Sequence, residues 1–159
     1  MHLRGLLVET HAHMPPAHIL QDLFEENSIR RIANIPHSIA GIVAHMDFWQ
    51  RWFLKRCRGE NVPMISSASQ GWPEAASGSW TEVRERFIAG IEEAAAVGST
   101  LELLDRPLSP PIEFPPFADY TVRDALIHVA NHNSHHLGQI VTLRQIAELW
   151  PPPAGSWTW

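Results

Sequence analysis

The sequence predicts an all-α fold built from four helical segments, and three observations support this class. Apolar residues recur at the three- and four-residue spacing of amphipathic helices along several long stretches. Helix-capping residues stand where these stretches begin, and no alternating pattern of useful length indicates a strand. The 13 prolines and 9 glycines gather between the helical stretches and therefore predict long connecting loops.

The first segment, residues 3–26, has a helical pattern of leucine and isoleucine that is interrupted at Pro15 and Pro16. A proline inside a helix removes a backbone hydrogen bond and clashes with the preceding turn, although it fits well at a helix start. We therefore expect a kinked or broken first helix, whose shape around the two prolines stays open.

The second segment, residues 34–56, predicts an amphipathic helix with Ser38 as its N-cap. His45 lies about 60° to one side of the apolar stripe, so it borders the buried face and can reach inward between helices. The simpler interpretation of His45 is a boundary histidine that is hydrogen-bonded to a neighbour. Asp47 points away from His45 on this helix, and we expect it to be exposed to solvent.

Residues 59–79 form a loop rich in Gly, Pro and Ser, with Trp72 as its large aromatic residue. A loop this long is commonly functional in a compact domain, and we expect Trp72 to pack over the mouth of a site. The third helix is predicted from Ser79 to about Val97, and Gly98 ends it.

A proline-rich crossover, residues 103–120, holds five prolines and predicts an extended, stiff connection. Thr121 and Asp124 then cap the last and longest helix, which we expect to continue to Trp150, before three consecutive prolines. Gly138 in its interior costs about 1 kcal/mol relative to alanine, which suggests close approach of a neighbouring backbone.

Length and charge limit the classes of function. The 159 residues fit a single domain, 1–159, that can bury its own core. A net charge of −5 with only 12 Lys and Arg leaves no basic stripe, so we expect no nucleic acid partner. No stretch approaches 18 uninterrupted apolar residues and Cys57 has no partner for a disulfide, so we expect a cytoplasmic protein with no membrane partner.

The stretch HVANHNSHHLGQI carries the strongest functional signal. His128, His132 and His136 recur every four residues, which turns each about 40° from the last and places all three on the inward face of the helix. A helix can offer two of these imidazoles to one metal ion, but His128 and His136 lie about 12 Å apart along the axis. A complete site therefore needs a ligand from another helix.

His45 is the candidate for that ligand. His132 can pair with either His128 or His136, and with His45 the set becomes three neutral imidazoles with open coordination positions, which is typical of catalytic sites. No Glu follows His132 as in HExxH, so a thermolysin-like mechanism is not supported. Gln139 lies on the same face and is a candidate for orienting a ligand or substrate. The competing interpretation is that the histidines merely pack.

The segments NHNSHHLGQI, PHSIAGIVAHMDFWQRWFLKRCRGE and LRQIAELWPPPAGSW resemble the DinB/YfiT-like family of metalloproteins, and the resemblance covers nearly the whole chain. The family's second-helix histidine matches His45, and its last-helix pair, followed by x-Gly-Gln, matches His132 and His136. The resemblance thus selects His136 over His128. Leu137 stands where family members often have an Arg, so no anion-binding role is carried over to this position.

The resemblance implies a four-helix bundle, frequently a homodimer, with a divalent metal ion on His45, His132 and His136. Zinc or nickel is favoured, and iron, cobalt or manganese also suit three imidazoles. For function it implies a metal-dependent transferase or isomerase that uses a low-molecular-weight thiol, or a hydrolase that activates water, acting on a small-molecule substrate. The alternative is a non-catalytic stress-response bundle that binds a metal or ligand.

Overall fold

The computed structural model describes residues 3–9, 13–73 and 79–156, and in these residues the chain forms helices and no β-strand. The elements in chain order are α1 (Leu3–Leu7), α2 (Pro16–Ile19), α3 (Glu25–Ser28), α4 (Ile39–Cys57), the 3₁₀ helix η1 (Ala68–Gly71), α5 (Trp80–Gly98), α6 (Leu101–Leu104), the 3₁₀ helix η2 (Pro115–Phe117) and α7 (Val122–Ile146). The predicted all-α class is confirmed.

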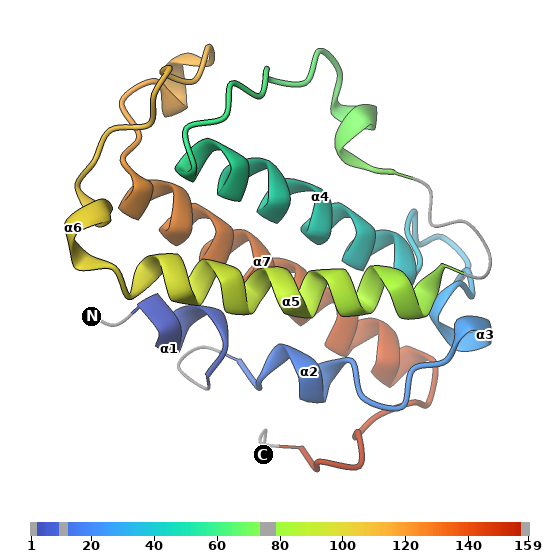
Figure 1. Cartoon of the computed structure of the whole chain (residues 1–159). Coiled ribbons are helices and arrows are strands. Elements are labelled where there is room, and N and C mark those ends of the chain that lie inside the picture. The colour runs from blue at the N-terminus through green and yellow to red at the C-terminus, as the bar shows by residue number, and fades with distance from the viewer. Residues whose placement is uncertain (1–2, 10–12, 74–78, 157–159) are drawn as a thin grey trace.

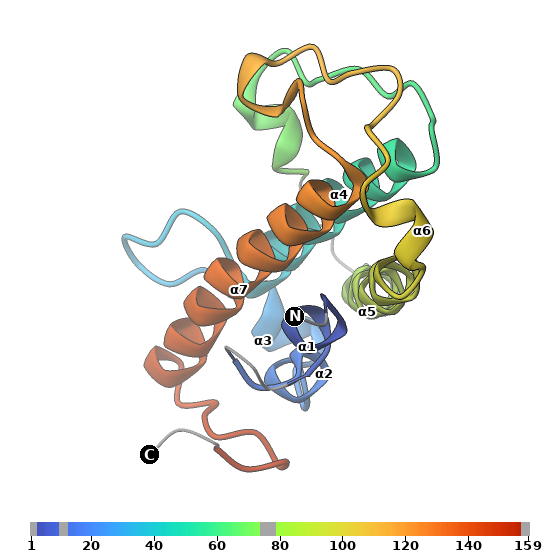
Figure 2. The same ribbon diagram turned by 90° about the vertical axis from the view of Figure 1, so that its left-hand side faces the viewer.

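Three long helices form the body of the bundle (Figure 1). Helix α4 packs against both α5 and α7, and the short α1 contacts α5 and α7 on their other side. Helix α2 continues from α1 beside α7, so the two short helices together occupy the fourth position of the bundle (Figures 1 and 2). None of the helices in the described part of the chain is long and apolar enough to cross a membrane.

The first helical segment is broken, as the two prolines predict. Helix α1 ends at Leu7, and α2 begins at Pro16, the first position of a helix. Proline has no backbone N–H to donate, but at this position it costs no hydrogen bond, because the first N–H groups of a helix have no partner within the helix.

The predicted N-caps of the two long helices that carry the histidines are present. The Ser38 hydroxyl accepts a hydrogen bond from the Gly41 N–H at 3.2 Å at the start of α4. Thr121 and Asp124 form a reciprocal capping box at the start of α7. Helix α7 ends at Ile146, earlier than the expected Trp150.

A polar link runs through the apolar core between the three long helices. Gln50 of α4 donates a hydrogen bond from Nε2 to the Phe87 carbonyl of α5 at 2.9 Å, and its Oε1 accepts one from Asn133 Nδ2 of α7 at 3.0 Å. Gln50 and Asn133 are both buried. Gly90 makes room for this link, because a Cβ atom there would lie 2.3 Å from Gln50 Nε2.

Two other expectations drawn from the sequence are also wrong. Asp47 is only 2% exposed, because Arg86 of α5 reaches its Oδ2 atom at 3.2 Å and Arg51 lies 3.6 Å from the same oxygen. Gly138 does not mark a close backbone approach, since a Cβ atom at that exposed position would meet nothing within 4 Å.

Candidate metal centre

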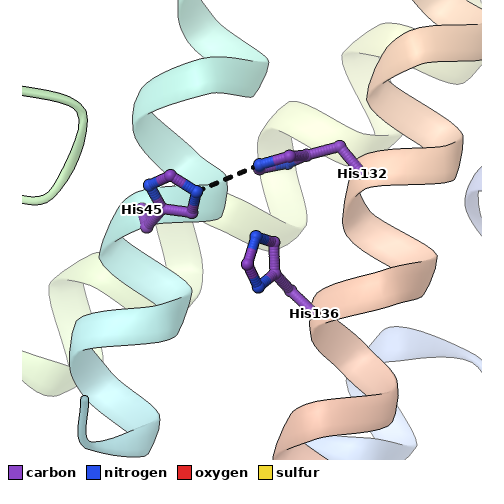
Figure 3. Close-up of side chains that lie close together, drawn as sticks. All are labelled: His45, His132 and His136. Atoms are coloured by element: carbon purple, nitrogen blue, oxygen red, sulfur yellow. Dashed lines mark hydrogen bonds between the residues drawn. The ribbon is translucent and has the colours of Figure 1, made fainter. Parts of the chain in front are cut away.

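The three histidines predicted as ligands meet between α4 and α7. His45 lies in the middle of α4, and His132 and His136 lie one turn apart on the facing side of α7. Figure 3 shows the three imidazole rings pointing into the space between the two helices. His45 and His136 are buried and His132 is half-buried. The structure therefore brings together the residues that the sequence singled out.

The spacing of the ring nitrogens suits a shared metal ion. One possible ligand nitrogen from each ring lies within 4.8 Å of the other two, and Nε2 of His45 is 3.0 Å from Nε2 of His132. Metal–nitrogen bonds of about 2.0–2.1 Å place neighbouring ligand nitrogens about 3 Å apart. A divalent ion thus fits this donor set without a large rearrangement.

The orientation of His45 is set by a backbone carbonyl. Its Nδ1 lies 2.5 Å from the carbonyl oxygen of Gly71, at the end of η1. A carbonyl oxygen can only accept a hydrogen bond, so Nδ1 carries the ring proton. The unprotonated Nε2 accepts a hydrogen bond from Nε2 of His132, and its lone pair is the one that a metal ion would take. A contact of this kind around a ligand fixes both the tautomer and the ring orientation.

Gln139 holds His136 in the same way. Its Oε1 atom lies 2.7 Å from His136 Nδ1, while its Nε2 atom lies 3.2 Å from Nε2 of His135. The amide oxygen accepts from His136 and the amide nitrogen donates to His135, which leaves Nε2 of His136 unprotonated. His135 therefore contacts Gln139 and is no member of the three-histidine group.

Trp72 covers the outer face of His45. The Trp72 and His45 rings stack with centroids 3.7 Å apart and planes 7° apart, and His37 stacks on the other face of Trp72 at 3.7 Å. The expected position of Trp72 over the site is thus observed. The sequence pattern gave no sign of His37, which lies before the α4 helix and outside its periodicity.

Burial keeps the three imidazoles neutral. Desolvation lowers the pKa of His45 to about 4, against a smaller raising effect of the Gly71 hydrogen bond. Desolvation, together with the neighbouring His136 and His45, lowers the pKa of His132 to about 3. Burial likewise lowers the pKa of His136. Neutral imidazole is the form that binds metal ions, so the cluster is ready for a metal ion at neutral pH.

His128, the alternative partner of His132, lies outside the group. Its ring centroid is 6.5 Å from that of His132, and its Nδ1 atom is 3.1 Å from the Tyr120 hydroxyl. The geometry therefore favours His136 over His128. Cys57 is buried, and burial raises the pKa of its thiol to about 11, so it offers no thiolate near neutral pH.

Two pockets reach the cluster, one at His136 and the other at His132. The first, here called the apolar pocket, has a volume of about 530 Å³ and includes His136, Trp72 and Gln139 in its wall. Its aliphatic wall residues are Ile35, Pro36, Ile42, Leu143 and Ile146. The second, here called the polar pocket, has a volume of about 370 Å³. It is lined by Tyr120, Asp124, Ile127, His128, Asn131, His132 and His135.

The described chain is thus a helical bundle in which three neutral histidines, a group that could hold a metal ion, converge between two helices beside two pockets. The sequence model of the DinB superfamily matches residues 8–140. The chain belongs to the DinB superfamily. Among curated proteins and among solved structures, nothing matches this chain.

Proposed function

We propose that this protein is a divalent-metal-dependent enzyme, with His45, His132 and His136 as the ligands and a low-molecular-weight thiol as co-substrate for S-transfer or isomerisation. The observation that carries the proposal is the cluster itself: three neutral imidazoles, each with one possible ligand nitrogen within 4.8 Å of the other two, with pockets against His132 and His136. When bound, a divalent ion supplies a Lewis acid that lowers the pKa of a thiol or water.

The surrounding residues hold the site in its binding form. The Gly71 carbonyl and the Gln139 amide oxygen keep the ring protons of His45 and His136 on the outer nitrogens. Trp72 shields one face of His45 from water. Three protein ligands leave at least one position open, which distinguishes a catalytic arrangement from a closed structural one.

The carboxylates near the site favour thiol chemistry over hydrolysis. Asp124 is the carboxylate among the residues that line the two pockets. It accepts hydrogen bonds from Thr121 at the cap of α7, and these lower its pKa. A carboxylate engaged in this way is a poor general base for activating water, whereas a thiolate needs no base at the moment of attack.

Metal analysis tests the ligand set. Untagged wild-type protein is expected to retain about one divalent ion per chain after dialysis, which elemental analysis also identifies. His132→Ala is expected to lose it, because two imidazoles remain, whereas the matched control His128→Ala is expected to keep it. Equal metal content in wild type and His132→Ala would contradict the proposed site.

Turnover tests the reaction class. The metal-loaded protein is incubated with cysteine, glutathione or a sugar-linked thiol and an electrophilic acceptor such as a haloalkyl bimane, and thiol consumption is followed. We expect metal-dependent consumption with at least one thiol. Full metal loading without turnover for any thiol would instead support the alternative, a non-catalytic metal- or ligand-binding bundle.

A further inference from the structure

The apolar pocket has the size and composition of a small-molecule site. Its volume of about 530 Å³ lies within the range of roughly 300–1,000 Å³ that is usual for such sites. Aliphatic side chains from the segment before α4, from α4 and from α7 form much of its wall, and the wall includes no Asp, Glu, Lys or Arg. Ile146, at 54% exposure, is one of the large hydrophobic residues exposed in the described part of the chain.

The position of this pocket makes it an entrance to the metal centre. His136 and Trp72 belong to its wall, and Trp72 stacks directly on His45. A molecule lying in the pocket therefore lies beside one of the three clustered histidines, His136, and beside the Trp72 ring that stacks on a second, His45. The polar pocket reaches His132 on the other side, and His135 borders both pockets.

We propose that the apolar pocket binds the acceptor substrate and that this acceptor is an uncharged, largely apolar small molecule. The role as acceptor rests on the proposed function, whereas binding of such a molecule in the pocket does not require the metal ion. The polar pocket, lined by Tyr120, Asn131 and Asp124, leaves a separate approach for a polar thiol.

Because the wall has no Asp, Glu, Lys or Arg, we expect the pocket to select neutral over charged molecules. An ionised group transferred into an apolar site without a partner loses its hydration and gains no ion pair, which strongly disfavours binding. The Thr142 hydroxyl, which donates to the Gly138 carbonyl, can still accept a hydrogen bond from a neutral polar atom, and the Gln139 amide keeps one further N–H beyond its bond to His135. The protein's net charge of −5 further disfavours anions.

Two dyes that share one scaffold test this selectivity. N-phenyl-1-naphthylamine is neutral, and 1-anilinonaphthalene-8-sulfonate is the same scaffold with a sulfonate; both fluoresce more strongly in apolar surroundings. In titrations of the full-length protein, the neutral dye is expected to bind saturably at one site and at least about tenfold more tightly than the sulfonate. Equal affinity, preference for the sulfonate or no saturable binding would overturn the proposal.

A pair of charge substitutions on α7 locates the dye. Ile146→Glu places a carboxylate in the wall of the pocket and is expected to weaken binding of the neutral dye about tenfold. Gln145→Glu adds the same charge at an exposed neighbour outside the wall and is expected to change the affinity less than about twofold. Both positions are exposed, so neither change threatens the core. Equal effects of the two substitutions would overturn the assignment.

The same variants separate this proposal from the proposed function. If turnover is observed, Ile146→Glu is expected to raise KM for the acceptor about tenfold and to leave KM for the thiol within about twofold. If the His132→Ala variant no longer binds metal but still binds the neutral dye, the assignment of the pocket is supported independently of the proposed reaction. If Ile146→Glu turns a dimer into a monomer in sedimentation and wild type fails to bind the dye, the face is a subunit interface and the proposal is wrong.

Discussion

The hydrogen bonds made by Nδ1 of His45 and Nδ1 of His136 determine that Nε2 is the nitrogen of each ring that can bind a metal ion. Nδ1 of His45 is bonded to the Gly71 carbonyl, and Nδ1 of His136 to Gln139. Each bond selects a tautomer and holds the ring against rotation, so a metal ion does not have to order the ligand as it binds. Metal affinity should therefore depend on residues that never touch the metal ion.

Gln139→Leu tests this dependence on residues outside the ligand set. The substitution removes the acceptor for His136 Nδ1, and we expect metal affinity to fall about 10- to 100-fold in competition titrations with a chelator. Gln139 is exposed, so the fold should be preserved. Gln145→Leu, an exposed change on the same helix, is the matched control and should leave the affinity unchanged. An equal affinity of the Gln139→Leu variant and wild type would contradict the positioning role.

The positions of the three histidines could be predicted from the sequence, whereas the groups that hydrogen-bond to them could not. Helix geometry alone puts His132 and His136 on one face, and the periodicity of the second segment turns His45 toward them. The Gly71 carbonyl could not be foreseen, because it belongs to a loop that returns to α4 after 26 residues. Asp47 was misjudged for a similar reason, since its partner Arg86 comes from another helix.

Hydrogen bonds of the buried Gln50 side chain connect α4 to both α5 and α7. Gln50 joins α4 to the Phe87 carbonyl of α5 and to Asn133 of α7, next to the proposed ligand His132. A buried polar link is worth keeping only when its hydrogen bonds are made, because an unpaired buried group costs about 1–3 kcal/mol. The link therefore fixes the relative height of α4 and α7, and with it the distance between the histidines that they carry.

The same substitution at two glycines should have opposite effects on stability. Gly138→Ala adds a methyl group in open space and is expected to stabilise the protein by about 0.5–1 kcal/mol through helix propensity. Gly90→Ala displaces the Gln50 amide from its buried partners and is expected to destabilise it by about 1–2 kcal/mol net. Urea unfolding of both variants measures the difference; a stabilising Gly90→Ala would show that the link is dispensable.

The start of a helix could be predicted from the sequence where a capping residue is present, and the other boundaries could not. Ser38 and Thr121 mark the starts of α4 and α7 because their side chains satisfy free backbone N–H groups. Pro15 and Pro16 predict the break in the first segment, but they do not predict where α2 packs. Beyond the end of α7 at Ile146 the chain turns back: Arg144 donates hydrogen bonds to the Leu149 carbonyl, and Glu148 has a φ of 60°, which a right-handed helix does not contain.

Proton binding couples the histidine cluster to the stability of the whole molecule. In the unfolded chain the histidines titrate near their ordinary pKa of 6.5, whereas in the folded, metal-free protein burial lowers that of His45 to about 4 and that of His132 to about 3. Between these values the unfolded chain binds more protons. Stability therefore falls as the pH falls below 6.5, and above it these groups cause no change.

For the metal-free protein we expect the urea midpoint to be constant between about pH 8 and 7 and to drop between about pH 6.5 and 5, where most carboxylates are still ionised. His132→Gln is expected to make the drop shallower, because it removes one of the groups that take up a proton on unfolding. Gln145→Leu should retain the full slope. The same slope in His132→Gln and wild type would mean that His132 is not held neutral by burial.

The proposed ligands His45 and His132 are separated by 87 residues in the chain. An unfolded chain, or α7 alone, can offer only the local pair His132 and His136, because bringing His45 to them requires closing that long loop at an entropic cost. On the proposed ligand set, binding of one metal ion by all three histidines requires that α4 has docked on α7. With metal ion in excess, the metal content of a preparation is therefore expected to report the fraction of chains that have completed folding, because misfolded chains lack the third ligand.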